Sequence, residues 1–219
     1  MIIFAEMKDR KLINAELHRI SAAEYGVQEA SGIAVVLDNV RSAYNVGSVF
    51  RSGDAFHADK ILLCGICALP PSAEIHKTAL GAEEVVPWEH FEDTLDAIHA
   101  LRADGYTVVA VEQTEHSLKL SAAGIPAPET ASLRSAPPVC DGPLPLMMPG
   151  VAQVTGAATP AATEAATKYA FVFGNEVEGV QQAVVDECDF ALEIEQHGTK
   201  HSLNVAVTAG IVLFAASQR

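Results

Sequence analysis

Residues 198–216 read GTKHSLNVAVTAGIVLFAA, a polar loop of small residues that runs directly into an apolar stretch. The apolar part, Val205–Ala216, is too short to span a membrane and contains Thr208 and Gly210, so we interpret it as a helix of the protein core. A polar loop that begins a buried helix brings backbone N–H groups and short side chains to one pocket. We therefore expect Ser202 and Asn204 to face a ligand at the start of this helix.

The size and composition of the chain indicate one α/β domain with small additions. Its 219 residues suffice for one well-packed core, and an apolar content of 49% excludes general disorder. We expect no secretory signal, because the apolar segment Met1–Ala5 is far too short for one. The cysteines of the chain are Cys64, Cys67, Cys140 and Cys188. Without a secretory signal, we expect them to be reduced thiols in a cytoplasmic protein.

The balance of charges excludes one class of function. A net charge of −14 argues against a non-specific nucleic-acid binder, because attraction to phosphates requires clustered lysine and arginine. A local basic face remains compatible with this charge. The candidate residues are Lys8, Arg10, Lys11 and Arg19 near the N-terminus, and Arg41, Arg51, Lys77 and Lys200 farther along the chain. The alternative for the N-terminal group is a set of scattered, solvated charges.

Hydrophobic patterns predict the order of helices and strands. Residues 9–29 are expected to be helical, in one or two pieces, with a capping box at Ser21–Glu24. Apolar strands alternate with helices after that, which favours a parallel sheet with helices on both faces. The expected strands are Ile33–Leu37, Lys60–Cys64, Tyr106–Val111, Tyr169–Phe173 and Phe190–Ile194, and the expected helices are Asn45–Phe56, Phe91–Ala103 and Ser202–Ala216.

The stretch from about residue 121 to 167 interrupts this alternation. It holds eight of the eleven prolines and twelve alanines but only four charged residues. Such a composition indicates a long irregular insertion between the third and fourth expected strands. Its role stays open among a lid, a linker, a partner-binding segment and a tolerated addition.

Several well-known sites are excluded by their missing residues. No GxGxxG follows the first strand, and Val180-Gln181 stand where a phosphate-binding loop starting at Gly174 requires lysine and serine or threonine. His197 and His201 are four apart, but Gly198 lies between them in a loop, so we expect no metal site. Cys64 and Cys67 lack a second pair that would complete a zinc site, and we interpret them as packing residues at a strand end.

Two earlier segments are the expected partners of the loop before Val205. Residues 45–51 read NVGSVFR and residues 173–179 read FGNEVEG. Ligands of parallel α/β proteins bind beyond the carboxyl ends of the strands, where Arg51 would offer its forked guanidinium to a phosphate. Each segment also has a plain structural interpretation: Arg51 as a partner of Asp54, the glycine segment as a turn, and Ser202 or Asn204 as a helix cap or first-turn residue.

Taken together, the three segments resemble the signature motifs of the SpoU (TrmH-type) RNA ribose 2′-O-methyltransferases, of the knotted SPOUT class. The matching motifs are Asn45 with Arg51–Phe56, Phe173–Val180, and Ile194–Gly198 with Ser202–Val205. The resemblance spans roughly residues 33–120 and 168–216. It departs from the family at the 121–167 insertion and at Glu195, where proline is common after Ile194.

The resemblance implies a trefoil-knotted parallel sheet with helices on both faces, S-adenosylmethionine as cofactor, and a homodimer whose active site combines both subunits. It also implies a domain division, with a helical extension at residues 1–30 and the catalytic domain at 31–219. The implied cofactor contacts, made largely through the backbone, are Ala110, Val111, Glu112, Gly174, Asn175, Ile194 and Leu203. The implied catalytic and RNA-facing residues are Arg51, Asn45, Glu176, Ser202 and Asn204.

The resemblance further implies methyl transfer to a ribose 2′-hydroxyl of RNA, with tRNA favoured over rRNA because only a short segment precedes the first strand. Family accounts make Arg51 the general base, but a guanidinium pKa above about 12 argues for an electrostatic clamp instead. One alternative is a non-catalytic knotted module that binds cofactor or RNA, which the acidity supports. Another is an α/β enzyme that uses a different nucleotide, which the missing phosphate loop opposes.

Overall fold

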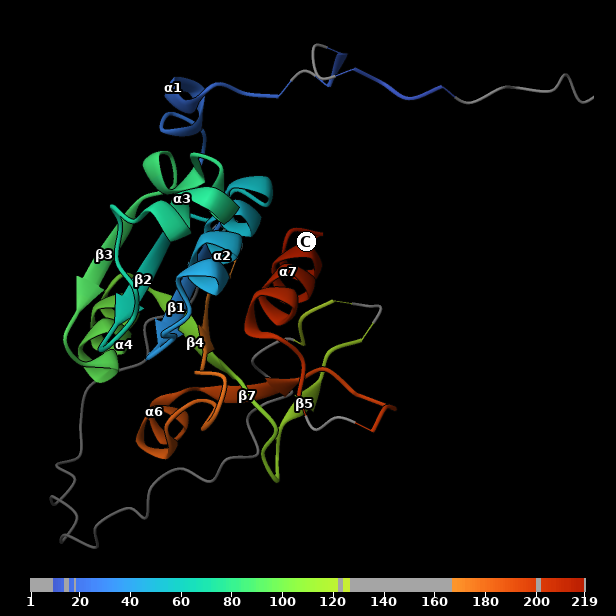
Figure 1. Ribbon diagram of the computed structural model, residues 1–219. Helices are drawn as coiled ribbons and strands as arrows, with labels where there is room; N and C mark the ends of the chain where they lie inside the picture. The colour runs from blue at the N-terminus through green and yellow to red at the C-terminus, as the bar shows by residue number, and fades with distance from the viewer. Residues whose placement is uncertain are drawn as a thin grey trace, which may run out of the picture.

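The protein is described from a computed structural model that covers residues 10–13, 16–17, 19–121, 124–126, 167–199 and 202–218. Its centre is a seven-stranded sheet in the order β3-β2-β1-β6-β4-β7-β5, and all neighbouring strands are parallel (Figure 1). The predicted parallel sheet is therefore confirmed. The strands are β1 (Ile33–Asp38), β2 (Lys60–Cys64), β3 (Trp88–Phe91), β4 (Tyr106–Val111), β5 (Leu118–Lys119), β6 (Lys168–Phe173) and β7 (Phe190–Glu193).

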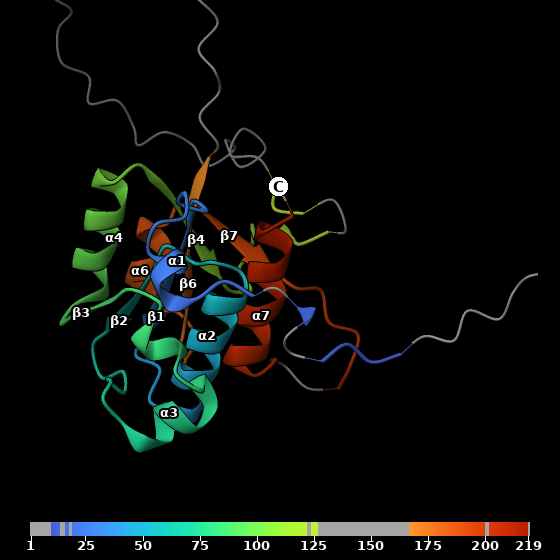
Figure 2. The same ribbon diagram turned by 90° about the horizontal axis from the view of Figure 1, so that it is seen from above.

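Helices cover both faces of the sheet, as predicted. In Figure 2, α2, α3 and α7 lie on one side, and α4 and α6 lie on the other. Each side has its own buried apolar cluster, so the sheet is the middle of three layers. The helices are α1 (Ala22–Tyr25), α2 (Ala43–Ala55), α3 (Ala73–Ala79), the 3₁₀ helix η2 (Ala82–Glu84), α4 (Thr94–Ala103), α6 (Gln182–Glu187) and α7 (Val205–Ala216).

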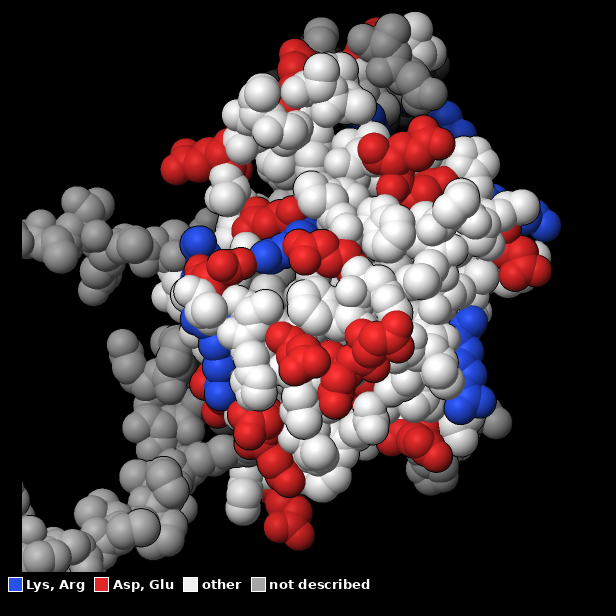
Figure 3. All heavy atoms as spheres, turned by 90° about the vertical axis from the view of Figure 1, so that its left-hand side faces the viewer, with Lys and Arg blue, Asp and Glu red and all other residues white. Residues whose placement is uncertain are grey.

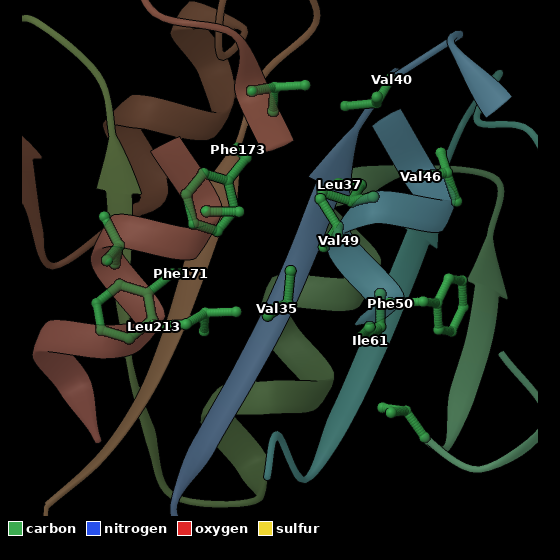
Figure 4. Close-up of a cluster of buried hydrophobic side chains, with 14 of the residues drawn as sticks. Val35, Leu37, Val40, Val46, Val49, Phe50, Ile61, Phe171, Phe173 and Leu213 are labelled. Carbon is green, nitrogen blue, oxygen red and sulfur yellow. The ribbon is translucent and has the colours of Figure 1, made fainter. Parts of the chain in front are cut away.

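The central strand β1 is buried along its whole length, which explains its unbroken apolar sequence. Side chains alternate between the two faces, so Val35 and Leu37 belong to the cluster beneath α2 and α7, and Val36 belongs to the cluster beneath α4 and α6. Figure 4 shows the first cluster, where Phe171 and Leu213 lie near β1. Full burial of one such side chain contributes roughly 1.5–3 kcal/mol to folding.

Two helices on the α7 side approach each other closely. A Cβ atom at Gly47 of α2 would lie 2.2 Å from Oγ1 of Thr78 and 2.3 Å from the carbonyl oxygen of Ile75 in α3. Thr78 Oγ1 also donates a hydrogen bond to the carbonyl of Tyr44, at 3.0 Å. Glycine at position 47 therefore lets the two backbones contact and fixes α3 against α2.

The helical N-terminal extension is found only in part. The predicted capping box is present at α1, where Glu24 accepts from the Ser21 N–H and Ser21 accepts from the Glu24 N–H. The described residues before Ser21 form no α-helix, so the expected helix over 9–20 is wrong for them. Their apolar side chains are exposed, and a short helix without a packing partner is not stable in water.

Other boundaries differ because edge strands and caps were not recognised. The helix expected from Phe91 begins at Thr94, since Asp93 caps it by accepting from the N–H of Leu95. Residues Trp88–Phe91 instead form the edge strand β3 beside β2. The elements β5, α3 and α6 were not expected either. Most of the 121–167 insertion, together with Lys200 and His201, lies outside the described residues.

None of the helices in the described ranges has the length and apolar character that a membrane span requires. The cysteine pair packs as predicted: Cys67 Sγ accepts from the Val40 N–H and donates to the carbonyl of Leu37. Burial raises the pKa of Cys64 to about 12 and that of Cys67 to about 11, so both thiols stay protonated.

Candidate functional site

A cleft of about 520 Å³ opens at the carboxyl ends of β4, β6 and β7, beside the start of α7. This is the edge where parallel α/β sheets bind ligands. The cleft joins the two later sequence motifs, since the segment after β6 and the loop before α7 both line it. Its lining residues are Val111–Gln113, Phe173–Gly179, Leu192–Ile194, Gln196, Ser202–Val205 and Thr208.

Gly174 is where the loop after β6 folds back on itself. The N–H of Asn175 donates to the carbonyl of Gly179, and the N–H of Gly179 donates to the carbonyl of Asn175, at 3.2 and 3.1 Å. A Cβ atom at Gly174 would lie 1.9 Å from the carbonyl carbon of Gly179. Position 174 therefore accepts no side chain, and the cleft has bare backbone at this point.

The side chain of Asn175 shapes this loop. Its Oδ1 accepts from the N–H groups of Val177 and Glu178, each at 2.9 Å. Such a bond pattern closes a tight turn within the loop. Asn175 thus lines the cleft as predicted, but its side-chain oxygen is engaged in holding the turn.

Glu112 ties the end of β4 to the same loop. One carboxylate oxygen accepts from the N–H of Val180 at 3.0 Å, and the other accepts from the N–H of Gln113 at 2.9 Å. A Cβ atom at Gly179, whose φ is +70°, would lie 2.2 Å from that first oxygen. Glu112 therefore connects the end of β4 to the loop after β6, and it also borders the cleft.

Asp38 is a residue whose part in the site the sequence patterns did not reveal. It is fully buried at the end of β1. Its carboxylate accepts bonds from Asn39 Nδ2, Thr94 Oγ1, and both the backbone N–H and Nε2 of Gln181, all between 2.7 and 3.0 Å. Asp38 therefore anchors the far end of the cleft loop to β1 and α4. The signal in the sequence was an acidic residue that ends an otherwise apolar strand.

Three residues of the predicted catalytic set form one hydrogen-bonded chain. Asn204 Nδ2 donates to Asn45 Oδ1 at 3.0 Å, and Asn45 Nδ2 donates to Glu176 Oε1 at 2.6 Å. This chain connects α2, the loop after β6 and the start of α7, which are the three sequence motifs. Asn204 is also the N-cap of α7, because its Oδ1 accepts from the N–H groups of Ala206 and Val207. The capping residue is therefore Asn204 and not Ser202.

Arg51 lies away from the cleft. It lines a second hollow of about 480 Å³ between α2 and α3, together with Ser48, Ser52, Ala55, Phe56, Lys77 and Thr78. Ser202 lines the cleft instead, so the chain by itself does not bring Arg51 and Ser202 to one site. The alternative partner Asp54 is not engaged either, since among the described residues Arg51 forms no ion pair.

Six of the seven predicted cofactor contacts line the cleft, and they are Val111, Glu112, Gly174, Asn175, Ile194 and Leu203. Ala110 does not. It is fully buried within β4, paired with Val172 and Ala191, and its side chain belongs to the core beneath α4 and α6. The side chain of Ala110 therefore does not line the cleft, because side chains of a strand alternate between faces, and its contact with the cofactor stays a prediction that concerns the backbone.

The lining of the cleft is acidic. Four carboxylates border it, from Glu112, Glu176, Glu178 and Glu193, and no lysine or arginine is among the described lining residues. Such a cleft favours a ligand that carries positive charge. Backbone at Gly174 and the exposed apolar side chain of Leu203 form another part of the lining, which suits the apolar part of a ligand.

A comparison with protein families identifies this combination of segments. The model described as the SpoU rRNA Methylase family matches residues 32–136 and 146–214 of the chain. The match includes all three segments that meet at the cleft.

Two curated proteins resemble the chain over most of its length. The 23S rRNA (guanosine-2′-O-)-methyltransferase RlmB of Vibrio vulnificus is 25% identical over 216 residues, which are 98% of this chain and 68% of that protein. A putative TrmH family tRNA/rRNA methyltransferase of Staphylococcus saprophyticus is 21% identical over 193 residues, which are 88% of this chain and 61% of that protein.

A solved structure supports the same fold. The AdoMet-bound rRNA methyltransferase from Sinorhizobium meliloti aligns with a TM-score of 0.63 at 24% identity, over 89% of this chain and 59% of that one. The chain thus spans between 59% and 68% of the length of these three proteins.

Proposed function

The chain belongs to the SpoU rRNA methylase family, and from this membership we propose that it transfers a methyl group from S-adenosylmethionine to a ribose 2′-hydroxyl of RNA. The observation that carries the proposal is the Asn204–Asn45–Glu176 chain of hydrogen bonds, which joins the three motifs at the rim of the acidic cleft. We assign the catalytic domain to residues 31–219 and treat residues 1–30 as an extension.

The cleft fits the proposed cofactor on three counts. S-adenosylmethionine carries a sulfonium and an ammonium group, which suit a lining of four carboxylates. The backbone of Gly174 lines the cleft without a side chain, and Val111, Ile194 and Leu203 offer apolar contact. When bound, this cofactor supplies a methyl group on a good electrophile, so the protein residues mainly have to position and activate the ribose oxygen.

The residues at the rim have distinct proposed roles. Asn45 is held from both sides, by Asn204 and by Glu176, so its amide is fixed where it can orient the ribose or a phosphate. Ser202 lies beside them and shapes the hydroxyl pocket. Arg51 acts as an electrostatic clamp that stabilises the developing negative charge on the ribose oxygen, and the hydroxyl proton is lost to solvent.

We propose that a homodimer completes the site, because Arg51 and Ser202 of one chain line different hollows. Helix α7 presents an exposed apolar stripe of Val207, Ile211 and Phe214, spaced for one helix face, and the exposed Leu203 lies just before the helix. Phe214 meets Phe56 edge to face, with ring centroids 5.9 Å apart, so the stripe borders the hollow of Arg51. A second copy seated on this stripe would bring its Arg51 to the neighbouring cleft.

The finer points of the proposal concern knot, substrate and location. The C-terminal segment is proposed to thread a loop of the chain, since α7 follows β7 yet packs against α2. Transfer RNA is the favoured substrate and ribosomal RNA the second, in line with relatives named for either. A cytoplasmic location agrees with an RNA substrate and with the protonated, buried thiols of Cys64 and Cys67.

The decisive experiment is methyl transfer from labelled S-adenosylmethionine to bulk tRNA and, separately, to bulk rRNA, followed by mapping of the methylated nucleotide. Arg51→Ala is expected to lower kcat by about 10²–10³-fold, as loss of one charge-stabilising donor typically does. Cofactor affinity, measured by calorimetry, should remain within about twofold, because Arg51 is assigned to the ribose oxygen and is not among the cofactor contacts.

Arg51→Lys is the intermediate variant, since it keeps the positive charge of the side chain and loses the forked N–H donors of the guanidinium. Near-normal transfer by Arg51→Ala contradicts the clamp. Cofactor binding without transfer to any RNA favours the alternative of a non-catalytic module.

A further inference from the structure

We propose that the hollow between α2 and α3 holds the phosphodiester backbone of the RNA next to the methylated ribose, with Lys77 and Tyr44 as its outer contacts. This inference rests on the proposed function and locates the substrate on the surface. The hollow has a volume of about 480 Å³, and Arg51 and Lys77 are both among its lining residues.

The hollow lies along one stripe of α2. Tyr44, Ser48, Arg51 and Ala55 follow each other at helical spacing, and all four are at least partly exposed. Asn45, at the start of the same helix, belongs to the hydrogen-bonded chain at the cleft. At 1.5 Å per residue, Asn45 and Arg51 are separated by about 9 Å along the helix axis. The stripe thus begins at the end of α2 that adjoins the cleft, so RNA bound at the cleft has this surface within reach.

The two contacts from outside the catalytic set are held in place. Lys77 Nζ lies 5.7 Å from the ring centroid of Tyr44, a cation–π distance. Helix α3 is fixed to α2 by the bond from Thr78 to the Tyr44 carbonyl and by the close approach at Gly47. Tyr44 is 46% exposed, so its ring face is accessible for stacking with a base. The positive charge of Lys77 is thus held at the rim of the hollow.

Ion pairing separates the cations of this protein into two groups. Lys60, Arg102 and Lys119 each have a carboxylate partner, at 2.7, 3.1 and 2.5 Å. Arg51 and Lys77 have no such partner among the described residues, and no carboxylate lines their hollow. Lys11, Arg19 and Arg41 form no ion pair among the described residues either, but Arg51 and Lys77 are the ones that line a common hollow, so their charge is available there for phosphates.

The acidity of other surfaces restricts where RNA can lie. Figure 3 shows the side that carries β3 and α4, where Asp and Glu side chains are prominent. Exposed carboxylates there include Glu89, Glu92, Asp93 and Asp96. Phosphates are repelled from such a face, so a chain of net charge −14 has to receive RNA at a local cationic surface.

Matched single-charge variants test the inference. Lys77→Gln removes a cation from the hollow, and Lys60→Gln removes one that is paired with Asp104 on another part of the protein. The full-length protein is titrated with fluorescently labelled bulk tRNA and, separately, labelled rRNA fragments at several salt concentrations. Methyl transfer and S-adenosylmethionine affinity are measured on the same preparations, and circular dichroism melting confirms that each variant is folded.

For Lys77→Gln we expect weaker RNA binding, with the slope of log Kd against log salt reduced by about 0.7–1. KM for RNA should rise severalfold while kcat and cofactor affinity stay within about twofold. Lys60→Gln should match the wild type in each measurement. Tyr44→Phe should keep the affinity, and Tyr44→Ala should weaken it by about fivefold or more through lost stacking.

The inference is overturned if Lys77→Gln and Lys60→Gln have the same salt slope, or if the wild-type protein binds neither RNA. The RNA titrations need no turnover, so they decide this point even if methyl transfer is absent. Absence of transfer by a wild-type protein that binds RNA through Lys77 would contradict the proposed function alone.

Discussion

The cleft and the hollow have similar volumes, about 520 and 480 Å³, yet they are opposite in charge and in construction. Four carboxylates border the cleft, whereas Arg51 and Lys77 are the charged groups of the hollow. The comparison teaches that the net charge of a protein does not predict the charge of each of its binding surfaces. An acidic protein can receive a polyanion when its unpaired cations gather at one place.

The two regions also differ in what holds them together. The cleft depends on buried or backbone contacts, such as those of Asp38 and Gly174. The hollow is lined by exposed side chains on two helices that are already packed. Substitutions at the cleft should therefore change stability as well as binding, and substitutions at the hollow should act through salt-dependent binding.

The strongest test of this difference is Gly174→Ala. The new Cβ would lie 1.9 Å from backbone of Gly179, so the loop has to open. Overpacking of this kind costs about 3 kcal/mol, and we expect S-adenosylmethionine binding to fall by at least about tenfold. Chemical denaturation and calorimetry measure the two effects.

Gly198→Ala is the matched control for the loop glycine, because a Cβ there has no atom within 4 Å. It should change stability and cofactor affinity little. An unchanged stability and cofactor affinity in Gly174→Ala would show that the loop adapts and that the cleft is not rigid.

The second test is Asp38→Asn, which keeps the size of the side chain. An amide cannot accept at both ends, so at least one donor from Gln181, Thr94 or Asn39 loses its partner. A buried unsatisfied donor costs about 2 kcal/mol. We expect a loss of stability of that size in urea denaturation, and faster hydrogen exchange at Gln181.

The exposed Asp54 on α2 provides the comparison, since Asp54→Asn removes the same charge without a buried network. Equal stabilities of the two variants would mean that Asp38 does not anchor the cleft loop.

The smallest effect concerns an ion pair between α3 and the helix η2 that follows it. His76 Nδ1 lies 2.5 Å from Glu83 Oε1, and this hydrogen bond raises the pKa of the exposed His76. Because the folded pKa lies above the unfolded value of about 6.5, the stabilisation is fully present below that pH and is lost as pH rises through the folded pKa. The Tm difference between wild type and His76→Gln should therefore be larger at about pH 5.5 than at about pH 8.5.

His116→Gln serves as the reference, since His116 is exposed on another loop. A difference for His76→Gln that grows with pH would contradict the direction of the pKa shift. The Tm difference should be small at either pH, because exposed ion pairs contribute little to stability.

Much of the fold was predictable because it follows local patterns. The apolar strands at Ile33, Lys60, Tyr106 and Tyr169 were placed within about a residue of their ends, since burial on both faces leaves an unbroken apolar run. The edge strands β3 and β5 were missed because half-exposed residues carry no such run. The prediction of an N-terminal helix was wrong for the opposite reason. Its apolar residues have a helical period, but they have no surface to pack against among the described residues.

The sequence predicted which segments form the candidate site better than it predicted how their side chains are arranged. Six predicted cofactor contacts line one cleft, because loops at the carboxyl ends of parallel strands necessarily meet. Ala110 does not line the cleft with its side chain, because its position within β4 directs that side chain to the opposite face. The role of Asp38 was missed, because its partners come from positions 39, 94 and 181, which sequence distance conceals.

The sequence by itself determined the class of the fold, the family, and the three segments that form the site, because these depend on local periodicity and short motifs. Only the tertiary structure decided that Asn204, Asn45 and Glu176 share one hydrogen-bonded chain while Arg51 faces a separate hollow beside Lys77. The physical reason is that the direction in which a helix side chain points depends on how the helix packs against its neighbours. The rotation of α2 between α3 and α7 sets which side chains reach the cleft, and no single segment encodes that rotation.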